Sequence, residues 1–344
     1  MLRFTNGIIK SGTMQYRAFG KTDLRVSEIG FGSWAIGGSA NVGGVEIGWG
    51  PSDDAISVQA IHAALEAGIN FFDTADFYGL GHAETLLGTT LGNNRNVVIA
   101  SKAGQRVGAD GKIEVNYTKD YIIKACEQSL RRLKRDAIDF HQLHVARMTH
   151  LEQGECIEAM QQLQQQGKVR YWGISLITFQ PFPEAEYFLQ NNLGDGFQMV
   201  FNLINQKALP IMEAAAAKGY GIIARMPLQF GLLSGKIKED TVFTADDHRS
   251  YRLVPHIIRA VLEILNDHVY PLLEKYQTTA AGLALSYILS YEEVSTVIPG
   301  IRTPEHVALN TNHIVQLEPA DQLFLRNLYN THWQPVMDLM ERQG

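Results

Sequence analysis

The chain has 344 residues, of which 45% are hydrophobic and 19% are charged, so it can bury a core as large as that of one barrel-sized domain. Its formal net charge is −6 and its lysines and arginines are scattered along the chain, which argues against nucleic acid as a partner. Its two cysteines, Cys126 and Cys156, lie in helical patterns without CxxC spacing, which indicates neither a disulfide framework nor a zinc site.

The N-terminal segment 1–13 lacks the continuous apolar stretch of a signal peptide, and no apolar run in the chain is long enough to cross a bilayer. We therefore expect a cytoplasmic protein without membrane association. Since patterned sequence begins at Met14, we interpret residues 1–13 as a loose extension, with Met1 or Met14 as the start.

From Met14 onward, MQYRAFGKTDLRVSEIG holds two short strand-like runs around a Gly-Lys-Thr-Asp turn. This pattern predicts a β-hairpin, and we expect it to plug the bottom of a barrel. Eight apolar runs follow, separated by helical patterns. They begin at Glu28, Asn70, Val97, Ile138, Val169, Phe197, Tyr220 and Ser295.

These runs are continuously apolar, as expected for strands that are buried on both faces, and their spacers are long enough for helical crossovers. The pattern predicts a single (β/α)8 TIM barrel over residues 14–344. The alternative, a doubly wound open sheet, lacks a GxGxxG fingerprint after its first strand. Three stretches exceed a minimal barrel: a glycine-rich loop from Gly37, a loop at 231–250, and extra C-terminal helices after Pro319.

Polar residues end several of the runs: Asp73, Lys102, His144 and Ser175, with Tyr78 close behind Asp73. Barrel strands present their carboxyl ends at one mouth, so these side chains should converge there. Reduction of a carbonyl needs hydride at carbon and a proton at oxygen. We expect the tyrosine to donate that proton, with its pKa lowered by the lysine, while the aspartate holds the lysine and the histidine orients the substrate oxygen.

Several motifs in order resemble one family, the aldo/keto reductases: DTADFYG, the strand end SK, DFHQLH, GKVRYWGIS and IPGIRTPEHVALN. The resemblance implies a (β/α)8 barrel, a nicotinamide cofactor and no metal. It also implies a catalytic tetrad of Asp73, Tyr78, Lys102 and His144, with Tyr78 as the proton donor.

The resemblance also assigns cofactor contacts. Ser175 and Gln198 match positions that hold the nicotinamide carboxamide, although Leu176 stands where many relatives have asparagine. Arg225 stands where a tyrosine or tryptophan often stacks on the nicotinamide, and a planar guanidinium can also stack. The strand IIARMPLQFGLLSGK, which holds Arg225, matches the segment beneath the nicotinamide and so implicates Pro227 and Leu228 as well. The loop 231–250 matches the segment that folds over the pyrophosphate, which implicates Gly231, Lys236 and Arg249.

After the eighth run, Thr303 and Pro304 fit the N-cap and first position of a helix, whose free N–H groups favour an anion. By family position, Gly300, Arg302, Thr303, His306 and Asn310 contact the cofactor, with Arg302 charged to suit a 2′-phosphate. This favours NADPH/NADP+, with NADH as the alternative.

For the substrate we predict a small carbonyl compound or polyol, contacted by Trp34, Trp49, Phe77 and Arg147. The sequence does not indicate an oligomeric state. Three alternatives to a reductase stay open: a sugar or cyclic-polyol dehydrogenase that works in reverse, a regulatory subunit resembling the β subunits of potassium channels, and a metal-dependent hydrolase. The last would use His141, His144 and Asp73, but three residues along a strand separate the two histidines onto opposite faces.

Overall fold

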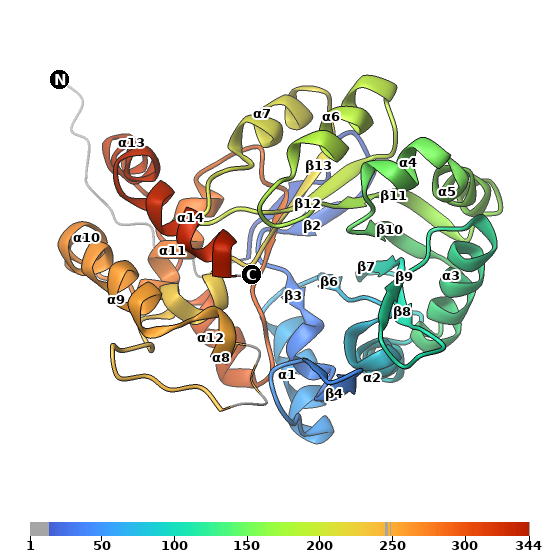
Figure 1. Cartoon of the computed structure of the whole chain (residues 1–344), viewed down its shortest axis with the longest axis horizontal. Coiled ribbons are helices and arrows are strands. Elements are labelled where there is room, and N and C mark those ends of the chain that lie inside the picture. Colours follow the sequence, from blue (N-terminus) through green and yellow to red (C-terminus); the bar gives the residue numbers. More distant parts are fainter. Residues whose placement is uncertain (1–13, 245–246, 248, 344) are drawn as a thin grey trace.

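The structure is a computed structural model that describes residues 14–244, 247 and 249–343, and the predicted extension 1–13 lies outside the described residues. Within the described ranges, eight parallel strands form one sheet, and helices surround it (Figure 1). Parallel bridges join Ile29 to Val297 and Gly32 to Gly300, so the sheet closes on itself. The predicted (β/α)8 barrel is confirmed.

Each predicted apolar run contains one barrel strand. The strands are β3 (Phe31–Gly32), β6 (Phe71–Asp73), β7 (Val98–Ala103), β10 (Ile138–His144), β11 (Val169–Ser175), β12 (Gly196–Val200), β13 (Gly221–Arg225) and β14 (Thr296–Ile298).

Alternate residues of these strands face the inside of the barrel. Phe71, Ala100 and Phe140 belong to an inner apolar cluster, whereas their neighbours Phe72 and Ile99 pack in the outer core against the helices. Because both faces are buried, the strands are apolar without alternation. The inward-facing rows continue to the mouth and end there in polar side chains. The row through Phe71 ends in Asp73, the row through Ala100 in Lys102, and the row through Phe140 in His144.

The bottom of the barrel is closed by the predicted hairpin, β1 (Tyr16–Ala18) paired antiparallel with β2 (Arg25–Ser27). Phe19 follows β1, is fully buried, and packs edge-on against Phe140 with ring centroids 4.8 Å apart. The backbone N–H of Lys21 donates to Gly219 O at 2.8 Å. The hairpin therefore acts as a plug, as predicted.

Helices cover the outer face of the barrel. They are α1 (Asp54–Glu66), α2 (His82–Leu91), α3 (Lys119–Leu133), α4 (Met148–Gln153), α5 (Glu155–Gln165), α6 (Phe182–Asn191), α7 (Leu209–Ala217), α11 (Ala280–Leu289) and α12 (Pro304–Thr311). Asp53 and Thr279 begin α1 and α11 by accepting backbone N–H groups of the first turn. Cys126 on α3 and Cys156 on α5 are buried and unpaired.

The connection after β13 is long and partly helical. It holds a 3₁₀ segment (Gln229–Ser234), then α8 (Arg249–Arg252), α9 (Pro255–Ile264) and α10 (Pro271–Tyr276). The predicted C-terminal helices are α13 (Pro319–Leu328) and α14 (Gln334–Gln343). An ion pair of 3.0 Å between Lys207 and Glu341 holds α14 to the barrel, and the side chain of Gln343 donates to Tyr251 O.

Two small hairpins at the mouth differ from the prediction. The glycine-rich stretch expected as a loop contains β4 (Ala40–Val42) and β5 (Val45–Ile47), joined by Gly43 and Gly44 with φ of 60° and 84°. Two successive positive φ values match a type I′ turn, which only residues such as glycine adopt readily. The pair β8 (Gln105–Val107) and β9 (Ile113–Val115) was also missed.

Among the described residues, no helix has the length and apolarity needed to span a membrane.

Candidate active site

The residues predicted as a tetrad meet at the barrel mouth. The ammonium of Lys102 donates to Asp73 Oδ2 at 2.7 Å, to Thr74 O at 2.8 Å and to Tyr78 OH at 3.0 Å. The Lys102 side chain is fully buried. Its three donors are thus all used, and one of them is aimed at the tyrosine oxygen.

The charge of Lys102 is maintained by its partners. Burial by itself would lower the pKa of Lys102, but the carboxylate of Asp73 and the hydroxyl of Tyr78 more than compensate, so this pKa lies above its usual value. Lys102 is therefore an ammonium at neutral pH.

The pKa of Tyr78 moves in the direction opposite to the one expected from sequence. Burial raises it above its usual value of 10, and the ammonium of Lys102 offsets only part of that rise. The prediction that the lysine lowers the pKa overall was wrong, because spacing along the chain does not show how completely the phenol is removed from water. The phenol consequently keeps its proton at neutral pH.

His144 completes the group, with its ring centroid 6.1 Å from that of Tyr78. Burial, reinforced by the charges of Lys102 and Arg225, holds the pKa of His144 well below its usual value. Its buried Nδ1 has no hydrogen-bond partner within the described residues. A neutral imidazole in this position can offer one N–H to a substrate oxygen.

His141 is separated from this group, as predicted. On β10, Phe140 belongs to the inner cluster and Leu143 to the outer core, so alternation directs His141 outward and His144 inward.

Ser175 and Gln198 are register partners on β11 and β12. Ser175 Oγ lies 3.4 Å from Gln198 Oε1, and Gln198 Nε2 donates to Asp73 Oδ1 at 2.7 Å. Gln198 therefore connects Ser175, the other residue expected to hold the nicotinamide carboxamide, to the buried ion pair of Lys102 and Asp73. The side chain of Leu176 packs in the outer core, and only its backbone contributes here: its N–H donates to Gln198 O at 2.8 Å and its carbonyl accepts from Arg225.

Arg225, at the end of β13, points toward this group. Its Nη2 donates to Leu176 O at 3.0 Å and to Thr178 Oγ1 at 3.2 Å, neither of which belongs to a carboxylate. Its buried Nε has no partner among the residues that the structure describes. An ion-pair role for Arg225 is thus not seen: Nη1 contacts Met226 Sδ at 3.2 Å, and Nε is the guanidinium nitrogen left for a ligand among the described residues.

The backbone just after β13 is strained. Met226, Gln229 and Phe230 have φ of 53°, 42° and 57°, around Pro227 and Leu228. The side chain of Asn202 holds this turn by donating to Met226 O and to Gln229 Oε1, both at 2.8 Å. Strain of this kind concentrates at ligand sites. Asn202 was missed in the sequence, although its place directly after a strand run was a usable signal.

A cationic cluster lies at the N-terminus of α12. Thr303 Oγ1 accepts the backbone N–H of His306 at 3.4 Å, so the predicted cap is present. The pKa of His306 is lowered by burial and, beyond that, by the charges of Lys236 and Arg302, which therefore both lie near it. Asn310 is buried further along α12.

The 231–250 loop faces the same region. Arg249 pairs with Asp247 at 2.6 Å, and a Cβ on Gly231 would lie 3.7 Å from Arg249 Nη1.

Two of the predicted substrate residues lie beside Tyr78. The Trp34 ring meets the Tyr78 ring edge-on, with centroids 4.8 Å apart. Phe77 packs with Val42 and Ile47 of the β4–β5 hairpin. This hairpin therefore forms an apolar wall next to the tyrosine.

The other two predicted substrate residues have structural partners. Arg147 Nε lies 3.1 Å from Glu184 Oε1 of α6, so its charge is already paired. The Trp49 ring covers Gly300, in the loop after β14.

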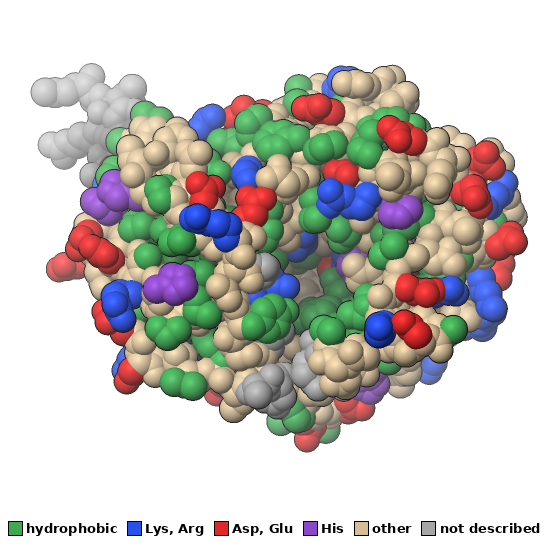
Figure 2. All heavy atoms as spheres, in the orientation of Figure 1, with side chains coloured by type: hydrophobic (Ala, Val, Ile, Leu, Met, Phe, Trp, Pro, Cys, Tyr) green, Lys and Arg blue, Asp and Glu red, His purple; other side chains and the backbone are tan. Residues whose placement is uncertain are grey.

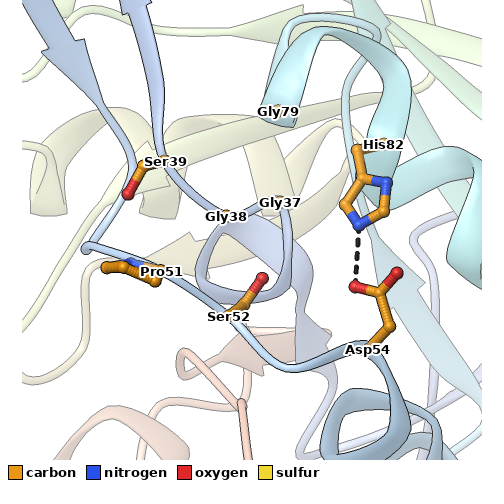
Figure 3. A pocket seen from close by; sticks show the side chains of 8 residues that line it. All are labelled: Gly37, Gly38, Ser39, Pro51, Ser52, Asp54, Gly79 and His82. Carbon is orange, nitrogen blue, oxygen red and sulfur yellow. Dashed lines mark hydrogen bonds and ion pairs between the residues drawn. The ribbon is translucent and has the colours of Figure 1, made fainter.

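The surface is hollowed in two places of interest. Figure 2 shows a depression near the centre of the face drawn, with basic side chains along part of it. A second hollow of about 370 Å³ lies behind the Tyr78 turn (Figure 3). It is lined by glycines, by Pro51 and Ser52, and by His82, whose Nε2 lies 2.9 Å from Asp54 Oδ1.

Residues 28–323 match the family model described as the aldo/keto reductase family. An uncharacterized oxidoreductase, YqkF of Bacillus subtilis (strain 168), is 31% identical over 86% of this chain and 90% of that protein. The NADH-specific methylglyoxal reductase of Escherichia coli (strain K12) is 27% identical over 90% of this chain and 96% of that protein. The solved glycerol dehydrogenase AKR11B4 from Gluconobacter oxydans is 27% identical, with a TM-score of 0.76 over 92% of this chain and 95% of that chain.

Proposed function

The chain belongs to the aldo/keto reductase family, and from this premise we propose that it is an NADP(H)-dependent oxidoreductase that reduces aldehydes or ketones to alcohols, with Tyr78 as the proton donor. The observation that carries the proposal is the buried chain of contacts from Asp73 through Lys102 to Tyr78, with N···O distances of 2.7 and 3.0 Å. We further propose that residues 14–344 act as one domain on a small carbonyl or polyol substrate.

The residues of the mouth fit a nicotinamide cofactor. Gln198 and Ser175 offer amide and hydroxyl groups side by side, and the buried Nε of Arg225, at the end of β13, has no partner in the described ranges. The cofactor, when bound, supplies the hydride that reduces the carbonyl carbon. The chain supplies everything else that the reaction needs.

In this proposal, His144 and Tyr78 hold the substrate oxygen, and the phenol gives it a proton as negative charge develops there. The phenolate left behind is stabilised by the ammonium of Lys102, which donates to that oxygen at 3.0 Å. Asp73 keeps Lys102 charged and aimed. Trp34 and Phe77 shield the site from water.

NADP(H) is favoured by the positive charges of Lys236 and Arg302 near His306 at the α12 N-terminus, where cations and free N–H groups suit a 2′-phosphate. Titration of purified protein with NADPH and NADH, followed by nicotinamide fluorescence, tests the proposal. We expect tighter binding of NADPH, and a preference that largely disappears in Arg302→Ala. Equal affinity for the two nucleotides would contradict the NADP(H) assignment, and no binding of either would contradict the redox function.

A second candidate, oxidation of a polyol or sugar by the same residues in reverse, is supported by Arg225 and by the similarity to a glycerol dehydrogenase. A guanidinium against the nicotinamide disfavours the oxidised, cationic ring relative to the reduced one, and so favours substrate oxidation on the enzyme. The contacts of Arg225 with Leu176 O and Thr178 hold it in the mouth.

We therefore expect Arg225→Tyr to raise the affinity for NADP+ relative to NADPH by about fivefold, equivalent to ~1 kcal/mol. Dissociation constants for both forms, measured on the variant and the wild type, check this. An unchanged ratio would show that the charge of Arg225 does not act on the ring.

A further inference from the structure

The segment Trp49–Ser52, which we call the strap, joins the β4–β5 hairpin to α1 and is tied to the loop after β14. Arg302 Nη1 donates to Trp49 O at 3.0 Å and to Pro51 O at 3.3 Å. The Trp49 ring lies so close to Gly300 that a Cβ there would be 2.7 Å from a ring carbon. Two independent contacts therefore attach the strap to the residues proposed to carry the cofactor.

The strap is also continuous with the substrate side of the mouth. Val42 and Ile47 of the hairpin pack on Phe77. At the base of the hairpin, Gly48 has φ of 115° and stands so close to Gly38 that a Cβ would be 2.2 Å from Gly38 O. A displacement of the strap should therefore also move the β4–β5 hairpin, which forms the apolar wall beside Tyr78.

The strap has room to move. The hollow in Figure 3 is lined by Pro51 and Ser52 on one side and by Gly79 and His82 on another, so it separates the strap from the N-terminus of α2. Pro51 is exposed, and Trp49 and Ser52 are half-buried. The contacts with Arg302 and Gly300 attach the strap to the loop after β14, and Ser52 Oγ donates to Ile36 O at 3.4 Å on its other side.

We propose that Arg302 is a positioning residue that acts as a latch. It holds the strap against the loop after β14 and thereby controls the entry and release of both NADPH and NADH. This inference rests on the proposed function. Only one guanidinium nitrogen, Nη1, makes the two bonds to the strap. The same side chain can thus hold the strap and face a 2′-phosphate.

The two roles of Arg302 differ in which cofactor they affect. A phosphate anchor acts on NADPH alone, because NADH has no 2′-phosphate, whereas a latch acts on both. Lys236 carries a charge near His306 but lies outside the strap, so its substitution tests the phosphate anchor without the latch. Trp49 belongs to the strap and carries no charge, so its substitution tests the latch without the phosphate anchor.

The test measures the release of bound NADPH and of bound NADH by stopped-flow displacement in the wild type, Trp49→Ala, Arg302→Ala and Lys236→Ala. We expect Trp49→Ala to speed the release of both cofactors about tenfold, because the substitution removes the contact between the Trp49 ring and Gly300. Arg302→Ala should do the same, with an additional effect on NADPH. Lys236→Ala should change only NADPH, and Val45→Ala, at the exposed hairpin tip, should change neither.

Hydrogen exchange on the cofactor-free protein provides a second readout. The latch predicts faster exchange of the backbone amides at 48–50 and 52 in Arg302→Ala and unchanged exchange in Lys236→Ala. Unchanged NADH release in both Trp49→Ala and Arg302→Ala, or unchanged exchange in Arg302→Ala, overturns the latch. Equal affinity of the wild type for NADPH and NADH, together with faster release of both cofactors in Trp49→Ala and Arg302→Ala, would instead refute the NADP(H) assignment and retain the latch.

Discussion

We expect Tyr78→Phe to lower kcat for carbonyl reduction by about 10²- to 10⁴-fold while NADPH affinity stays within about twofold of the wild type. The substitution removes one oxygen, and Lys102 keeps its bonds to Asp73 and to Thr74 O at 2.7 and 2.8 Å. The charge arrangement around the site is therefore preserved and only the proton donor is lost. Steady-state turnover with an aldehyde, together with a fluorescence titration of NADPH, measures the two effects separately.

Tyr287→Phe is the matched control for this substitution. Tyr287 is fully buried, whereas Tyr78 is half-buried, and the Tyr287 hydroxyl lies 2.8 Å from that of Tyr291, away from the mouth. Its loss should leave kcat unchanged. If Tyr78→Phe retained more than about a tenth of the wild-type kcat, a different group would have to donate the proton.

The pH dependence of reduction follows from the same groups. Reduction needs the protonated phenol, and burial raises the pKa of Tyr78 above 10, so the rate of the chemical step should fall only above that pH. Burial holds the pKa of His144 well below its usual value, so this side chain stays neutral. Its protonation therefore does not lower the rate as the pH falls from neutrality to about 6. Reductive single-turnover rates from about pH 6 to about pH 9 should therefore be level.

Lys102→Met should destabilise the protein by about 3–5 kcal/mol, because it leaves the carboxylate of Asp73 buried without its counter-ion. The Lys102 and Asp73 side chains are 0% and 3% exposed. It should also lower kcat by at least about 10²-fold, since the phenolate loses its stabilising cation. Urea unfolding and steady-state kinetics on the same preparation measure both.

The pair of Lys168 and Glu127 provides the control, because its N···O distance is also 2.7 Å but its side chains are 33% and 39% exposed. Lys168→Met should cost about 0–1 kcal/mol. Equal losses in the two variants would show that burial of the Lys102–Asp73 pair has little effect on stability.

The sign of the pH effect on this stability is fixed by Lys102. Its pKa in the folded protein is raised above 10.5, so the stabilisation is present below that pH and is lost as the pH rises through the folded value. The difference between wild type and Lys102→Met should stay constant between about pH 6 and about pH 9 and shrink only in stronger alkali.

The barrel, its plug, the C-terminal helices and the polar residues at the strand ends could all be predicted from the amino-acid sequence. The reason is local: strands buried on both faces must be continuously apolar, and the inward rows through Phe71, Ala100 and Phe140 can place polar groups only at the mouth. The convergence of Asp73, Lys102 and His144 follows from that register.

Three features depend on the folded arrangement and could not be predicted from the sequence: the direction of the Tyr78 pKa shift, the bond between Gln198 and Asp73, and the attachment of the strap to Arg302. Burial depends on how many elements surround a side chain, and these contacts join positions that lie 125 and 253 residues apart in the chain. Arg147 gives the same lesson: its spacing from His144 suggested a substrate ligand, and its partner Glu184 comes from a helix that only folding brings near.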